Sequence, residues 1–187
     1  MATAYSTTNS IKKAYVPLGA PYGDAVSELI TVVGATAASE ERIVDGTLFL
    51  AGDYTTGLAY NTGVSILIQN GANDGLYLLS TILSSMDCKV EVYETPTFSA
   101  AGSTVTARNL NRTSSKVLDA TITKNPTVSV DGTQIGPTIM NQANVKSTLL
   151  DNVIILAPST NYYIKVTNVS NNVGILNTIL ELYQPNL

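Results

Sequence analysis

The sequence contains no histidine, no tryptophan and a single cysteine, and only 13% of its 187 residues are charged. Histidine is the usual general base near neutral pH and the commonest metal ligand. Its absence excludes Ser-His-Asp and Cys-His catalysis and histidine-containing zinc sites. The one cysteine, Cys88, cannot form an internal disulfide. This cysteine usage fits a protein that is made and folded in a cytoplasm.

Basic residues are also few, and they are scattered. The chain has ten Lys and Arg against fourteen Asp and Glu, and the only adjacent basic pair is Lys12–Lys13. Nucleic-acid binding depends on clustered Lys and Arg that displace counterions from phosphates. No apolar run approaches the length of a membrane span, and residues 1–15 lack the apolar core of a signal peptide. We therefore expect neither nucleic acid nor a membrane among the partners.

Carboxylate pairs are the remaining route to hydrolytic chemistry. Glu91 and Glu94 are three residues apart on an expected strand, so they point to opposite faces; Asp87 and Glu91 are the nearer candidates. Carbohydrate-cleaving sites normally carry aromatic platforms, and this chain has no Trp and two Phe. Residues 70–75 faintly resemble a calcium loop but lack its closing Glu. We expect no catalytic residue, no metal ligand and no cofactor, and hence a protein that is not an enzyme.

What the sequence does contain is a β pattern. Hydrophobic residues make up 44% of the chain, and Thr and Asn, which favour strands and turns respectively, make up roughly a fifth. Short apolar or alternating runs are separated by Gly, Pro, Asn and Asp, as in an antiparallel sandwich. The pattern predicts an all-β fold, an antiparallel β-sandwich of jelly-roll type. The expected strands are 47–50, 63–69, 77–83, 88–94, 104–109, 118–122, 127–130, 153–156, 162–168 and 174–183.

Residues 88–94 alternate most cleanly. Strict alternation places one face of a strand in the core and the other in solvent. The pattern predicts that Val90 and Val92 are buried and that Lys89 and Glu91 are exposed. Cys88 falls on the buried face, where we expect a small core residue rather than a reactive thiol.

Two further segments carry structural predictions. Arg112 lies in a strand-poor stretch, and its guanidinium offers five donors in a fixed fork. It could form a hydrogen-bond hub with Asn109 and Asn111, or it could simply face solvent; the sequence leaves both open. At the C-terminus, residues 162–183 read as a hairpin of central strands, because Ile164, Val166, Ile175, Ile179 and Leu182 are bulky and apolar.

The N-terminal region differs in composition. Residues 1–27 are polar and interrupted by Pro and Gly, so we interpret them as an extended arm, with residues 28–187 as a single sandwich domain. A disordered tail is the open alternative. Residues 28–46 could contain a strand followed by one or two helical turns. If the arm orders on a partner, Lys12, Tyr15 and Pro17 are the contacts we would test first.

Three stretches occur in a recognisable order. The first is Val90–Pro96, followed by Ser99–Gly102 and Thr104–Val105. The second is Asn109–Ser115. The third runs from Leu156 to Tyr183 and includes Tyr162–Asn168 and Ile179–Tyr183. Together they resemble the small accessory virion proteins of tailed phages, of the capsid decoration or cement type, over roughly residues 47–183.

The resemblance implies a function and partners. It implies a bacteriophage structural protein that coats or stabilises the head through contacts with the major capsid protein or other virion proteins. It also implies synthesis in the host cytoplasm, a final location on the virion head surface, and a homo-oligomer, with a trimer as the first expectation. The alternative is a carbohydrate- or receptor-binding module of a fibre or tail, which would have the same fold class and could use the ten tyrosines.

Overall fold

The computed structural model describes residues 40–73, 75–148 and 154–185. The chain divides into two units, Met1–Asp45 and Gly46–Leu187. In the first unit, residues 40–44 form a short helix, and the Asp45 amide donates to the Glu41 carbonyl at 2.8 Å. The expected boundary between residues 27 and 28 lies outside the described residues, as do Lys12, Tyr15 and Pro17.

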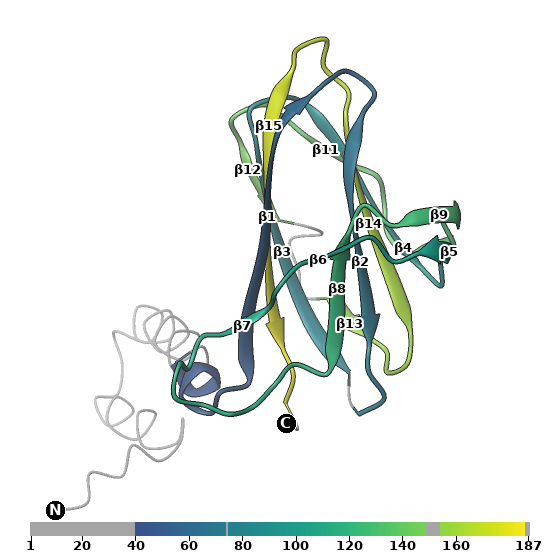
Figure 1. Ribbon diagram of the computed structural model, residues 1–187. Helices are drawn as coiled ribbons and strands as arrows, with labels where there is room; N and C mark the ends of the chain where they lie inside the picture. The colour runs from purple at the N-terminus through teal and green to yellow at the C-terminus, as the bar shows by residue number, and fades with distance from the viewer. Residues whose placement is uncertain (1–39, 74, 149–153, 186–187) are drawn as a thin grey trace, which may run out of the picture. The chain divides into compact units, whose positions relative to one another are not determined.

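The second unit is an antiparallel sandwich, as the sequence predicted, with two sheets facing each other (Figure 1). The six-stranded sheet contains β1 (Leu48–Leu58), β3 (Leu76–Ser84), β7 (Arg108–Asn109), β12 (Lys146–Thr148), β13 (Ile154–Leu156) and β15 (Gly174–Tyr183). The seven-stranded sheet contains β2 (Gly63–Asn70), β4 (Cys88–Glu94), β6 (Ser103–Thr104), β8 (Ala120–Lys124), β10 (Thr133–Gln134), β11 (Ile139–Asn141) and β14 (Asn161–Asn168). A separate ribbon pairs β5 (Thr97–Ala100) with β9 (Thr127–Val130).

The strand order is that of a jelly roll. The first strand pairs with the last, β1 with β15, and moving inward along the chain β2 pairs with β14, β3 with β12 and β13, and β4 with β10 and β11. Successive pairs alternate between the two sheets. Such nested antiparallel pairing wrapped into two layers defines the fold. Strands β6 and β8 extend the seven-stranded sheet beyond β2.

The core lies between the sheets and follows the period-two alternation of each strand. Strand β14 alternates Tyr162, Ile164 and Val166 into the core, and β15 alternates Leu176, Thr178, Leu180 and Leu182. Both strands are central in their sheets, which confirms the prediction for residues 162–183. They do not form a hairpin, however, because β14 lies in the seven-stranded sheet and β15 in the six-stranded one.

The register of β15 shows which of its apolar residues face the core. Since Leu176, Leu180 and Leu182 face inward, Ile175 and Ile179 must face outward. Ile175 is exposed and Ile179 is partly exposed. These two isoleucines, which helped to predict a central strand, therefore lie on its outer face.

One ion pair links the two sheets at their open edge. The Lys124 ammonium on β8 lies 2.6 Å from the Asp53 carboxylate on β1, and the Thr55 hydroxyl donates to the same carboxylate at 2.7 Å. Asp53 is only 10% exposed, so these two donors offset the cost of removing its charge from water.

Candidate functional site

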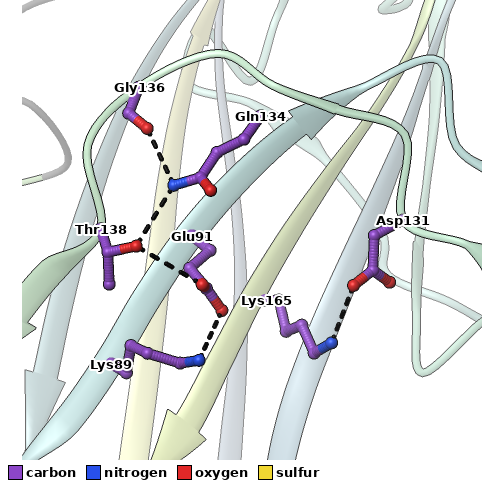
Figure 2. A network of polar contacts seen from close by, with 7 residues as sticks. All are labelled: Lys89, Glu91, Asp131, Gln134, Gly136, Thr138 and Lys165. Carbon is purple, nitrogen blue, oxygen red and sulfur yellow. Dashed lines mark hydrogen bonds and ion pairs between the residues drawn. The ribbon is translucent and has the colours of Figure 1, made fainter.

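The outer face of the seven-stranded sheet carries a polar network (Figure 2). Residues 131–138, which we name the strap, run across this face and are held at two points. At one, the Lys165 ammonium on β14 binds the Asp131 carboxylate at 2.9 Å. At the other, the Thr138 hydroxyl contacts Glu91 Oε1 at 3.4 Å. Within the strap, Gln134 Nε2 donates to the Gly136 carbonyl at 2.9 Å and to Thr138 at 3.2 Å.

The strap overturns one prediction for the alternating strand. Cys88, Val90 and Val92 are buried as predicted, and Lys89 is partly exposed, but Glu91 is only 9% exposed. Glu91 does point away from the core, and its carboxylate is paired with the Lys89 ammonium at 3.0 Å. Thr138 lies beside it, on the segment that leads into β11, and contacts its carboxylate, as Figure 2 shows.

The pKa values of two side chains on this face, Lys165 and Tyr93, are raised. The hydrogen bond to Asp131 raises the pKa of the Lys165 ammonium. A raised lysine pKa stabilises the fold below the ordinary lysine pKa and ceases to do so as the pH rises through the folded-state value. Since both partners are more than a third exposed, the pair contributes little. Burial, followed by the charges of Glu91 and Asp131, raises the pKa of the Tyr93 phenol.

A shallow hollow of about 330 Å³ lies beside the two lysines. It is lined by Asn61, Gly63, Val64, Ser65, Lys89, Tyr163, Lys165, Val166 and Thr167. Gly63 keeps part of this surface open, because a Cβ there would lie 2.2 Å from the Val166 carbonyl oxygen. The ring of Tyr163 packs beside that of Tyr93, with centroids 6.1 Å apart. The lining offers polar donors and one aromatic ring, and both lysines are already neutralised by carboxylates.

The outer face of the six-stranded sheet is of a different kind. The core side chains of β1, β3 and β15 alternate with a second apolar set that points outward. We name this set the apolar face; its members are Leu50, Tyr54, Tyr77, Leu79, Leu83, Ile155, Ile175, Ile179 and Tyr183. Five of them are well exposed: Tyr54 at 62%, Ile155 at 61%, Ile175 at 40%, and Leu50 and Leu83 at 37% each.

Polar groups on the apolar face are few. Asn177, Glu181 and Thr81 are outward neighbours of the apolar side chains, and the charged groups that the structure describes there are Glu181 on the central strand and, at the edge, Arg108 on β7, which pairs with Leu50. Isolated exposed hydrophobics are normal on soluble proteins, whereas contiguous exposed patches are the kind of surface that proteins use for interactions. Sequence reasoning missed this face.

A hydrogen-bond hub lies in the loop where one was predicted, but its centre is Asn109 and not the Arg112 guanidinium. The Asn109 amide donates to the Gly46 carbonyl at 2.8 Å and to the Lys116 carbonyl at 3.2 Å, and its Oδ1 accepts from the Asn111 amide at 2.9 Å. Asn111 in turn accepts from the Thr113 amide and hydroxyl. Arg112 is exposed, and within the described part of the chain its guanidinium has no hydrogen-bonding partner. The short Asn side chains hold this loop because each accepts a hydrogen bond from the backbone N–H two residues further along the chain. The Arg112 side chain is too long to bond to such near backbone groups.

Replacing Asn109 by Ala is therefore expected to lower the free energy of unfolding by about 1–3 kcal/mol, because three hydrogen bonds are lost. Arg112→Ala and Arg112→Lys, the matched changes three residues away, should each alter it by less than about 0.5 kcal/mol. Urea unfolding followed by circular dichroism measures all three. A larger loss of unfolding free energy at Arg112 than at Asn109 would mean that the Arg112 guanidinium is the centre of the hub.

The remaining candidates of the sequence carry no site. Cys88 is fully buried, and burial raises the pKa of its thiol, so it is a core residue as predicted. Across the described residues, no three His, Cys, Asp or Glu side chains cluster as metal ligands. In the same residues, no helix is long and apolar enough to cross a membrane.

Comparison with known proteins adds no family. No protein-family model matches the chain, and no curated protein is significantly similar to it.

Proposed function

We propose that this protein is a structural component of a phage virion, of the capsid decoration or cement type, and that it works through protein–protein contacts rather than catalysis. Three observations support the proposal. The order of the stretches in residues 90–183 resembles such proteins. The jelly roll is an architecture that capsid proteins use repeatedly, although a shared fold alone does not establish a shared function. The third observation is the apolar face.

The apolar face is the observation that carries the proposal. Nine outward apolar side chains on one sheet form a surface that water disfavours by about 25 cal/mol per Å² of apolar area. A binding module that functions as a monomer gains nothing from such a face, whereas in a protein that functions within an assembly the face is covered by a neighbouring protein. The partners proposed are therefore other virion proteins, the major capsid protein first, and further copies of the same chain on the head surface.

The arm at residues 1–27 is the segment we propose for the shell contact. It is poor in large apolar residues, and a segment of that composition orders most naturally on a partner. Attachment should depend only weakly on salt, because few charged residues are available to form pairs that salt can screen.

The test mixes undecorated capsid shells with the full-length protein or with a variant lacking residues 1–27, and then pellets the shells. We expect the full-length protein to co-sediment at both low and high salt. The truncated variant should retain its β circular dichroism and bind less. Equal binding of the two would remove the arm from the contact, and failure of the full-length protein to bind would remove the decoration function.

A second candidate function rests on the hollow of the seven-stranded sheet. Its volume is near the lower limit of small-ligand sites, and its lining of Asn61, Ser65, Thr167 and two neutralised lysines suits an uncharged, hydroxyl-rich ligand such as a glycan. A glycan array separates the two functions. Binding that Ser65→Tyr abolishes, because the larger side chain fills the hollow, would favour a receptor-binding module.

A further inference from the structure

We infer that two copies of this chain associate through their apolar faces, stacked sheet on sheet about a two-fold axis that crosses the strands at Ile179. The inference rests on the proposed function in one respect: it names a second copy of the chain as the partner of the apolar face, the surface that carries that function.

The outward side chains of β1, β15 and β3 form straight rows across the sheet. Pairing places Gly52, Ile179 and Thr81 in one row. The row on one side contains Leu50, Glu181 and Leu79, and the row on the other side contains Tyr54, Asn177 and Leu83. Over β1, β15 and β3 the central row is therefore flanked by two rows of matching character, each with apolar side chains on β1 and β3 and a polar side chain on β15. Beyond these three strands the first row continues to Arg108 on β7 and the second to Lys146 on β12.

Rotation by 180° about an axis along the central row generates a second copy stacked on the first. Each flanking row of one copy then lies over the other flanking row of its partner. Each strand then lies over the same strand of the second copy, running in the opposite direction. Leu79 meets Leu83, Leu50 meets Tyr54, and Ile179 meets Ile179. The Glu181 carboxylate meets the Asn177 amide, which is a hydrogen-bond donor. Glu181, the charged group on the central strand of the face, thus acquires a polar partner twice per dimer, as an isologous interface requires.

The alternative two-fold axis, along β15, fails on the same residues. It would leave each row opposite itself and place Glu181 over Glu181, burying two like charges in an apolar layer. The face therefore selects the crossing axis. It also favours a dimer over the trimer that the resemblance implies, because a flat self-complementary face is satisfied by one second copy.

The size of the face is adequate. Strands about 4.8 Å apart and outward residues about 6.7 Å apart along each strand give roughly 500 Å² of sheet per copy over the four strands from β1 to β13. Two copies would bury roughly 1,000 Å² in total, which is the lower limit for a specific interface. Face-to-face stacking of two sheets about 10 Å apart is also how sandwiches form their own cores.

The experiment measures the dimerisation constant of the full-length protein by analytical ultracentrifugation across a concentration series. We expect a monomer–dimer equilibrium in the absence of shells. Asn177→Glu should weaken the dimer by at least about tenfold, because it places a carboxylate opposite Glu181. Within one copy these two positions are four residues apart along β15, about 13 Å, so folding is little affected. Thermal unfolding of each variant confirms this.

The exchanged double variant, Asn177→Glu with Glu181→Asn, should restore dimerisation because each carboxylate again faces an amide. Val117→Lys, at an exposed apolar residue in the loop between β7 and β8, is the matched control and should leave the constant unchanged. A monomeric full-length protein, or an Asn177→Glu variant that dimerises normally, would overturn the inference. Binding to shells is measured separately. A monomer that still binds shells would contradict only the dimer inference, and a dimer that does not bind them would contradict only the proposed decoration function.

Discussion

Leu180→Ala is expected to lower the free energy of unfolding by about 3–5 kcal/mol, a large share of what holds a domain of this size together. Leu180 is fully buried on β15, the strand that lies between β1 and β3. Truncation removes its apolar contacts and leaves a cavity, which strands paired on both sides cannot collapse to fill. Guanidinium unfolding monitored by circular dichroism gives the midpoint and the slope.

Leu110→Ala is the matched control for this change. Leu110 is 38% exposed in the loop after β7, so the same truncation there should cost less than about 1 kcal/mol. Comparable losses at the two leucines would mean that β15 does not present Leu180 to the core, and the register of the whole strand would then be in doubt, since a slip of one residue exchanges its faces.

Asn168→Ala is expected to cost about 2–4 kcal/mol, the largest effect of any polar substitution considered. Asn168 is completely buried at the end of β14. Its amide donates to the Leu58 carbonyl at 2.9 Å and to the Asn172 carbonyl at 2.8 Å. Its Oδ1 accepts from the Ser170 amide at 2.8 Å and from the Ser170 hydroxyl at 2.9 Å. One side chain thus joins the end of β1 to the turn that leads into β15.

The cost arises because alanine leaves the Leu58 carbonyl buried without this donor, and that penalty exceeds the mean value of a hydrogen bond. Asn171→Ala, an identical change at an exposed position in the same turn, should leave stability within about 0.5 kcal/mol. Differential scanning calorimetry of the two variants decides the matter, and equal melting temperatures would show that Asn168 does not join the two segments.

The sequence predicts strands well where apolar residues alternate, and poorly where pairing overrides composition. The runs at 63–69, 88–94 and 162–168 correspond closely to β2, β4 and β14. By contrast, β1 continues to Leu58 through Gly52, Asp53 and Gly57, residues that disfavour strands. It does so because β15 pairs with it along almost its whole length. No local pattern could reveal that partner, which lies more than a hundred residues away.

The two outer faces show a second limit. Alternation predicts correctly that the Glu91 side chain points outward. It cannot predict that Thr138, from a distant part of the sequence, will contact the Glu91 carboxylate. The apolar face did leave a signal. Residues 76–84 and 174–183 are apolar at odd and even positions alike, a pattern of strands covered on both sides. The hub was predicted in the correct loop but assigned to Arg112, because donor number was weighed above the reach of the short Asn109 amide.

The nested pairing of the jelly roll has a consequence for biosynthesis. Strand β1 is the first of the described strands to leave the ribosome, and its partner β15 is the last of them, more than a hundred residues later. The six-stranded sheet therefore cannot close until β15 has been translated. Contacts between residues so distant in sequence also make folding slow, on the scale of milliseconds to seconds. Until then, β1 and β3 lack the strand that lies between them. Prematurely terminated chains would therefore expose the apolar residues of both faces of this sheet to aggregation and proteolysis.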